Sequence, residues 1–269
     1  MITSVANSRV KNVISLIKKA KSRKEQGVFV VEGIRMVSEA PKDRIKELYV
    51  SESFLKREEN RSFLEKEVGV PFEAVKDDVF AKMSDTVSPQ GILCVLRRME
   101  HNLEHMLEQK EGTFLVLEDI QDPGNLGTMI RTGEGAGIAG VIMSSRTVDI
   151  YNSKVIRSTM GSIYRVPFCY VDDLPAALRL LRKRGVTTYA AHLSGDRYYD
   201  ECFFDGQIAL LIGNEGNGLS DEITSLAEYR LKIPMEGQVE SLNAAISASV
   251  LMYEAHRQKR GRSLLNKKK

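Results

Sequence analysis

The sequence predicts an α/β protein in which a small N-terminal α/β domain precedes a second α/β domain built on a mostly parallel sheet. Three observations predict this architecture. The 269 residues suffice for two domains, because one hydrophobic core usually serves roughly 100–200 residues. Short apolar runs alternate with segments that can form helices. A polar stretch interrupts that alternation once. We therefore expect a domain at 1–98, a linker at 99–112, a second domain at 113–258 and a basic tail at 259–269.

The N-terminal domain is predicted to open on a basic amphipathic helix. Within residues 8–20, Val10, Ile14 and Ile17 recur at helical spacing, and lysines occupy other positions of the same segment. Four apolar runs then predict strands, and two segments between them can form helices. The expected strands lie at 28–31, 47–51, 70–75 and 91–96, and the expected helices at 33–40 and 77–84.

The second domain repeats this alternation over a longer stretch. The linker before it is polar and has some helical character. Six apolar runs predict strands, with helices between most of them and a final helix from about 241 to 258. The strands are expected near 114–120, 140–145, 165–170, 186–192, 208–213 and 229–234. Alternation at this spacing predicts a mostly parallel sheet that helices cover on both faces.

Charge is distributed unevenly along the chain. Residues 1–24 and residues 255–269 each carry seven basic side chains and no acidic one, which leaves 25 basic against 36 acidic side chains in between. Two strongly basic ends favour contact with a polyanion such as RNA. Taken alone, the same charges could equally be solubilising faces.

Several classes of protein are disfavoured. No run reaches the ~18 uncharged apolar residues of a membrane helix, and the N-terminus lacks a signal peptide pattern, so we expect a cytoplasmic protein without membrane contact. The three cysteines are scattered and form no CxxC pair, which argues against disulfides and a zinc site. His101 and His105 lie four residues apart but have no third ligand nearby, so we expect no metal.

Three loops after predicted strands have the composition of a functional site, since sites in such folds lie beyond the carboxyl ends of strands. Their sequences are QDPGNLGTMIRT at 121–132, NEGNGLS at 214–220 and MEGQVESLN at 235–243. In the first, Pro123 and Gly124 predict a tight turn, and Asn125 is placed to cap the helix that follows.

A further glycine cluster has the residue spacing of a dinucleotide-binding motif but not its structural context. Gly135, Gly137 and Gly140 spell G-x-G-x-x-G, but the match ends a helix and leads into a strand, whereas the nucleotide fingerprint follows a strand and opens a helix. We interpret these glycines as a helix C-cap and a close-packed turn, and expect no nicotinamide or flavin site.

Four segments together resemble a known family. They are DPGNLGTMIRTGEGAG (122–137), NSKVIRSTMGSIYRVPF (152–168), LLIGNEGNGLS (210–220) and IPMEGQVESLNAAISASVLMYE (233–254). In this order they are similar to the motifs of the SpoU or TrmH family of RNA ribose 2′-O-methyltransferases, within the SPOUT superfamily. The resemblance implies a C-terminal trefoil knot, a rare exception to unknotted topology. It also implies that the loops at 192–195, 213–218 and 233–243 wrap the cofactor S-adenosyl-L-methionine, with backbone groups near Leu193, Gly213, Ile233 and Leu242.

The resemblance further implies a set of polar site residues, namely Asn125, Arg131, Glu215, Ser241 and Asn243. A guanidinium is a poor base, so we expect Arg131 to hold a phosphate or hydroxyl of the target nucleotide, with direct proton abstraction as the alternative. Ser241 and Asn243 are expected to open the last helix. Ser241 could instead be only an N-cap, and Glu215 could brace its loop or pair with Arg131.

Residues 1–98 are similar to the substrate-binding domain that precedes the catalytic domain in ribosomal RNA members of the family. This resemblance favours ribosomal RNA as the substrate. A tRNA 2′-O-methyltransferase and a non-catalytic RNA-binding protein remain the alternatives. Family members form homodimers through the knotted region, and Arg131 of one chain is expected to reach the cofactor pocket of the other.

Overall fold

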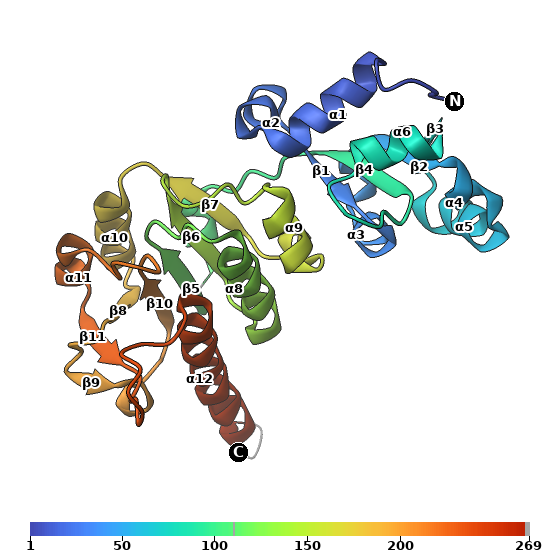
Figure 1. Ribbon diagram of the computed structural model, residues 1–269. Coiled ribbons are helices and arrows are strands. Elements are labelled where there is room, and N and C mark those ends of the chain that lie inside the picture. The colour runs from blue at the N-terminus through green and yellow to red at the C-terminus, as the bar shows by residue number, and fades with distance from the viewer. Residues whose placement is uncertain (110, 267–269) are drawn as a thin grey trace. The chain divides into compact units, whose positions relative to one another are not determined.

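The computed structural model describes residues 1–109 and 111–266, without the side chains of 263–266, and it divides into two compact units (Figure 1). The N-terminal unit consists of Met1–Met99 together with Asp149–Tyr164, and the C-terminal unit consists of Glu100–Val148 together with residues from Arg165 onward. The sequence division placed all of 149–164 in the second domain. The contacts of this segment instead group it with the N-terminal unit.

The N-terminal unit has a four-stranded mixed sheet in the order β1-β4-β2-β3, in which only the β2–β3 pair is parallel. The strands are β1 (Val28–Glu32), β2 (Ile45–Ser51), β3 (Glu73–Val75) and β4 (Ile92–Arg97). All four apolar runs predicted in this half therefore form strands. The α-helices are α1 (Ser8–Lys18), α2 (Ala20–Gln26), α3 (Ile34–Ser38), α4 (Glu52–Lys56), α5 (Glu58–Phe63), α6 (Asp77–Met83) and α9 (Ser153–Thr159). There are also two short 3-10 helices, η1 (Lys42–Arg44) and η3 (Ser162–Tyr164), and a π-helix, η2 (Leu64–Val68).

Helix α1 packs its apolar stripe against one face of this sheet. The Asn7 side chain accepts a hydrogen bond from the Arg9 amide and so caps the helix. Val10, Val13 and Leu16 are fully buried, whereas the predicted Ile14 and Ile17 are only partly buried at the edge of the same core. The helix stops at Lys18 and a second basic helix, α2, follows immediately, which the sequence analysis did not separate.

The C-terminal unit is a seven-stranded sheet in the order β7-β6-β5-β10-β8-β11-β9, and every strand pair in it is parallel. Six strands match the predicted runs, and the two-residue β9 does not come from an apolar run. The strands are β5 (Gly112–Leu117), β6 (Gly140–Ser144), β7 (Phe168–Val171), β8 (Thr187–Ala191), β9 (Arg197–Tyr198), β10 (Gln207–Ile212) and β11 (Tyr229–Lys232).

Helices cover both faces of this sheet, as predicted. On one face α10 and α11 pack over apolar side chains of β5 and β10, and on the other α8 and α12 pack against each other and against the sheet (Figure 1). The helices are α7 (Leu103–Met106), α8 (Pro123–Ala136), α10 (Leu174–Lys183), α11 (Asp221–Leu226) and α12 (Ala244–Asn266), with the turn η4 (Tyr199–Glu201).

Helix α12 is longer than the predicted final helix. It begins at Ala244 rather than near 241 and continues to Asn266, through most of the predicted basic tail, whose last residues 267–269 lie outside the described residues. Within the part of the chain that the structure describes, no helix is long and apolar enough to cross a membrane. The three cysteines are buried and free.

Candidate functional site

The carboxylate of Glu215 lies at the centre of the polar part of the site. This residue follows β10, and its oxygens accept hydrogen bonds from the backbone amides of Gln121 and Asp122, each at 3.0 Å. They also accept one from the Nδ2 group of Asn125, at 3.0 Å. Glu215 therefore joins the loop after β10 to the loop after β5, because the carboxyl ends of these parallel neighbours meet at one edge of the sheet.

These hydrogen bonds also keep Glu215 ionised. Partial burial tends to raise the pKa of its carboxyl group, but the donors from Asn125, Gln121 and Asp122 outweigh burial and hold the pKa below its ordinary value. Both oxygens are occupied by donors, so Glu215 is a poor proton acceptor at neutral pH. Of the two alternatives for this residue, bracing the loop is the one that the structure contains, and no ion pair with Arg131 is found among the described residues.

A second hydrogen bond extends this arrangement to the last helix. The Nδ2 group of Asn243 donates to Oδ1 of Asn125 at 3.0 Å, and Oδ1 of Asn243 accepts from the amides of Ala245 and Ile246. Asn243 is thus the N-cap of α12, whereas Ser241 lies two residues before it. We call the chain Glu215, Asn125 and Asn243 the polar platform; it unites three of the five predicted polar residues.

The prediction that Asn125 caps its helix is wrong. The N-cap of α8 is Asp122, whose side chain accepts a hydrogen bond from the Asn125 amide at 2.8 Å, and Pro123 occupies the first turn. Pro123 and Gly124 are accordingly helical rather than a separate tight turn. A proline suits the first helical turn because its missing N–H is not needed there. The Asn125 side chain is consequently free to bind Glu215 and Asn243.

A pocket of about 260 Å³ adjoins the polar platform. Its walls come from the loops after β8, β10 and β11 and from the start of α12. All four predicted cofactor residues line it, together with Glu215 and Ser241 of the polar set. Those four are Leu193, Gly213, Ile233 and Leu242, and further apolar lining comes from Ile212, Leu219 and Leu231.

Two glycines let the backbone of this pocket pack closely. A Cβ atom on Gly213 would lie 2.0 Å from the carbonyl carbon of Gly218, so the loop closes against itself only because Gly213 has no side chain. The closed loop is held by paired hydrogen bonds between the backbones of Asn214 and Gly218, at 3.0 and 2.9 Å. Likewise, a Cβ on Gly195 would lie 2.6 Å from the carbonyl carbon of Leu231.

Sequence reasoning did not assign Gly195 individually, nor the backbone amides of Gln121 and Asp122. Close backbone approach leaves no signal in composition, although Gly195 stands within the predicted 192–195 loop. His192 also lines the pocket, where its Nδ1 atom lies 2.8 Å from Oγ of Ser194 and accepts the Ser194 amide proton.

Arg131 does not join the platform. Arg131 lies six positions after Asn125 on α8. At 100° per residue, this spacing places the two side chains on different sides of the helix. Its side chain is exposed and has no hydrogen-bond or ion-pair partner among the described residues. A guanidinium in this position is available to bind something outside its own chain.

The arrangement can hold a nucleoside-like ligand with a charged tail. Apolar side chains and exposed loop backbone suit an adenosine, and the carboxylate of Glu215 supplies negative charge at the edge of the pocket. S-adenosyl-L-methionine has these features, because it joins an adenosine to a methionine portion through a positively charged sulfonium. The residues present therefore fit this cofactor. Among the described residues, no group of three His, Cys, Asp or Glu side chains could hold a metal ion.

Comparison with known proteins identifies the family. A model of the SpoU rRNA methylase family matches residues 112–253, and a model of the MRM3-like substrate binding domain matches residues 7–94. The 23S rRNA (guanosine(2553)-2′-O)-methyltransferase RlmP of Bacillus subtilis (strain 168) is 34% identical over 255 residues, which span 94% of this chain and 97% of that protein.

Two solved structures are similar over almost the whole chain. An AdoMet-bound rRNA methyltransferase from Sinorhizobium meliloti superposes with a TM-score of 0.84 at 30% identity, covering 95% of this chain and 97% of the other. The SpoU methyltransferase AviRb from Streptomyces viridochromogenes, in complex with AdoMet, gives a TM-score of 0.84 at 26% identity, covering 94% and 98%. The chain belongs to the SpoU rRNA methylase family, and the predicted fold class of two α/β domains is confirmed.

Proposed function

We propose that this chain transfers a methyl group from S-adenosyl-L-methionine to a ribose 2′-hydroxyl of RNA, and that the RNA is ribosomal. The observation that carries the proposal is the pocket built from three strand-end loops with the polar platform beside it. The family match over both units supports it, as does the 2′-O specificity in the name of the Bacillus subtilis relative. Solved relatives with AdoMet bound support the cofactor.

In this proposal the protein contributes mainly orientation. When bound, S-adenosyl-L-methionine supplies an electrophilic methyl group, and a hydroxyl attacking it in line must be held within about 3–3.5 Å. Asn125 and Asn243 hold the first and last helices of the site in register, and Glu215 fixes the loop that forms one pocket wall. Ser241, which lines the pocket two residues before the N-cap, is proposed to orient the methionine portion or the ribose.

Arg131 is proposed to hold the target nucleotide in the active site of a second copy of the chain. Its exposed position on α8, away from the polar platform of its own chain, supports a site shared within a homodimer. Two large apolar side chains on α12, Ile246 and Tyr253, are also half-exposed, at 49% and 50%. Side chains of this kind favour burial against a partner, and α12 packs directly on α8.

RNA capture is assigned to the N-terminal unit. The lysines of α1 and α2 are exposed, and the match to a substrate binding domain covers this half. A ribosomal RNA substrate also fits the cytoplasmic location that the sequence predicts. The trefoil knot that the family resemblance implies remains part of this proposal.

The proposal is tested by incubating the full chain with methyl-labelled S-adenosyl-L-methionine and separate samples of ribosomal RNA and tRNA. Digestion to nucleosides then locates the label. We expect a 2′-O-methylated nucleoside from large-subunit ribosomal RNA. Label found only in tRNA would show that tRNA is the substrate. Label on a base would show that the reaction is base methylation. RNA binding without any label would favour a non-catalytic RNA-binding protein.

A further inference from the structure

Residues Asp149–Tyr164, which we call the inserted segment, complete the core of the N-terminal unit although they lie between strands β6 and β7 of the C-terminal unit. Tyr151, Val155 and Ile156 are at most 2% exposed, and helix α9 of the segment packs against β1. The ring of Tyr151 lies 4.5 Å from that of Phe29 on β1. The chain therefore leaves the catalytic sheet, covers part of the N-terminal sheet and returns.

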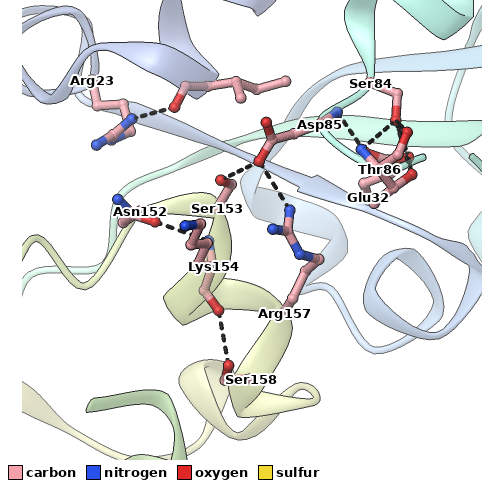
Figure 2. Close-up of polar contacts among 11 residues, drawn as sticks. Arg23, Glu32, Ser84, Asp85, Thr86, Asn152, Ser153, Lys154, Arg157 and Ser158 are labelled. Atoms are coloured by element: carbon pink, nitrogen blue, oxygen red, sulfur yellow. Dashed lines mark hydrogen bonds and ion pairs between the residues drawn. The ribbon is translucent and has the colours of Figure 1, made fainter. Parts of the chain in front are cut away.

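Polar contacts fix α9 in this position (Figure 2). The carboxylate of Asp85 accepts hydrogen bonds from Oγ of Ser153 at 2.6 Å and from Nη1 of Arg157 at 3.1 Å. Burial tends to raise the pKa of Asp85, but these two donors outweigh it and lower the pKa. The loop that holds Asp85 is itself fastened to β1, because Glu32 accepts hydrogen bonds from the hydroxyls of Ser84 and Thr86.

The chain crosses between the units at three points, and a hydrogen bond within the N-terminal unit secures each one. Next to the first crossing, the Tyr151 hydroxyl donates to the carbonyl oxygen of Met99 at 2.7 Å and accepts from its amide at 2.8 Å. At the second, Arg23 binds Asp149. At the third, the Tyr164 hydroxyl donates to the carbonyl oxygen of Met36 at 2.9 Å.

Arg23 differs from every lysine around it. Lys18, Lys19, Lys21 and Lys24 are exposed, whereas the Arg23 side chain is 4% exposed. Its Nε and Nη2 atoms donate to Oδ2 of Asp149 at 2.9 and 2.6 Å, and Nη1 donates to the carbonyl oxygens of Leu16 and Ile17 at the end of α1. One guanidinium thus binds both the end of α1 and the start of the inserted segment.

The residue before Asp149 is secured within the C-terminal unit. The Val148 amide donates to the carbonyl oxygen of Ile120 at 2.8 Å, and the Val148 carbonyl oxygen accepts from the hydroxyl of Tyr170 at 2.7 Å. Ile120 precedes Gln121, whose amide binds Glu215 of the polar platform. Asp149 is therefore tied through Arg23 to α1 and α2, and the preceding residue, Val148, is tied to the loop after β5.

We infer that Arg23 and Tyr151 are positioning residues for RNA methylation, which hold the inserted segment so that RNA bound by α1 and α2 is presented productively to the site. This inference rests on the proposed function. A loosened segment would leave both binding surfaces intact while making the reactive geometry rarer, because a displacement of about 1 Å far from the chemistry can cost up to about 100-fold in rate. The expected signature is a fall in kcat without a matching change in affinity.

The test uses Tyr151→Phe and Arg23→Gln in the full chain, with Tyr49→Phe as the matched control. Tyr49 is also a buried tyrosine of the N-terminal unit, but its hydroxyl binds Glu47 rather than a residue at a crossing. For Tyr151→Phe we expect kcat for RNA to fall about tenfold, with KM for RNA and Kd for S-adenosyl-L-methionine within about twofold of wild type. The kcat of Arg23→Gln should fall further, and the kcat of Tyr49→Phe should equal that of wild type.

Two results would overturn the inference. One is an unchanged kcat in Tyr151→Phe, which removes only a hydroxyl and so retains the ring packing. The other is a loss of activity in both Tyr151→Phe and Tyr49→Phe that is accompanied by matching losses of Tm and RNA affinity. That result would show that the Tyr151 hydroxyl has a structural role alone. If the wild-type chain itself transfers no methyl group to RNA, the proposed function fails instead, and the wild-type reaction makes that case distinguishable.

Discussion

The two glycine clusters of the C-terminal unit have similar composition and different surroundings. At 135–140, Gly137 ends α8 in the left-handed region with φ 68°, and a Cβ on Gly140, the first residue of β6, would lie 2.3 Å from the Met106 methyl group. At 213–218, the glycines follow β10 and line the pocket. The interpretation of Gly137 as a helix C-cap is confirmed, whereas the closely packed Gly140 begins β6 instead of lying in a turn, and Gly135 lies within α8.

The role of a glycine pattern therefore depends on the element that precedes it. After a helix, glycine relieves backbone strain and lets a strand begin close to its neighbours. After a parallel strand, glycine brings backbone groups to the edge of the sheet where ligands bind. Order along the chain therefore separates a structural cluster from a binding cluster, even where the sequence letters match a nucleotide motif.

The largest expected effect comes from placing a methyl group in each cluster. Gly213→Ala would put a Cβ 2.0 Å from backbone of Gly218, so the loop must open. We expect S-adenosyl-L-methionine affinity to fall about 100-fold or more, which is roughly 2.7 kcal/mol. Gly137→Ala meets open space but has a positive φ, so it should cost about 1 kcal/mol of stability and leave cofactor affinity intact.

Calorimetry with S-adenosyl-L-methionine and NAD on both variants measures this contrast, with unfolding curves as a control for folding. Wild-type chain should bind no NAD. A folded Gly213→Ala variant with wild-type cofactor affinity would contradict this prediction. So would NAD binding by the wild-type chain that Gly137→Ala abolishes.

The second-largest effect is expected at Arg131, which lies on α8, the helix that ends at the first glycine cluster. We expect Arg131→Ala and Asn243→Ala homodimers each to lose about 100-fold in methyl transfer. In a mixed dimer with shared sites, one site has both lesions and the other has neither, so activity should return to about half of wild type. Co-refolded variants and an RNA methylation assay measure it. A confirmed heterodimer without recovery would reject the shared site while leaving the methyltransferase proposal standing.

The third effect concerns RNA affinity, which is expected to depend on lysines of the N-terminal unit and not on either glycine cluster. Changing Lys18, Lys19 and Lys21 to Glu should reduce the slope of log affinity for duplex RNA against log salt by about three, since each lost phosphate contact removes about one. Cofactor affinity should not change. Binding titrations at several salt concentrations test this, with the exposed lysines 42, 46 and 66 of the same unit reversed as a control. Equal slopes in all three proteins would make the α1 and α2 lysines a solvated face.

The smallest effect is a pH dependence at the second cluster. The hydrogen bonds on Glu215 lower its pKa below the ordinary 4.5, so the stabilisation they give is fully present above that value. It is lost as pH falls through the lowered folded pKa. The free energy of unfolding should therefore be about 1 kcal/mol higher in wild type than in Glu215→Gln at every pH down to about pH 4.5, and this difference should shrink below it. Thermal unfolding across that range measures it, and a difference that grows on acidification contradicts the assignment.

Much of the fold was predictable because buried strands leave short apolar runs: six strands of the parallel C-terminal sheet and the four strands of the mixed N-terminal sheet coincide with such runs. The gathering of Asn125, Glu215 and Asn243 was implied by family motifs and by the shared edge of the strands. Asp122 rather than Asn125 caps α8 because both residue types cap well and the position of Pro123 decides between them.

The inserted segment shows what a single sequence leaves open. Val155 and Ile156 are buried, and a single sequence does not say which sheet covers them. Their packing on β1 depends on contacts such as Arg23 with Asp149, which lie more than a hundred residues apart in the chain. The two-residue strand β9 is likewise too short to give a period.

The most direct test of the central claim, that the pocket at the second glycine cluster holds the cofactor, is photochemical crosslinking with methyl-labelled S-adenosyl-L-methionine followed by tryptic mapping. The sequence separates the two clusters, since one tryptic peptide spans 132–146 and another spans 198–230. We predict label in peptides 185–197, 198–230 or 233–257, which contain the pocket loops, and its loss in Gly213→Ala. Label concentrated in peptide 132–146 would contradict the account.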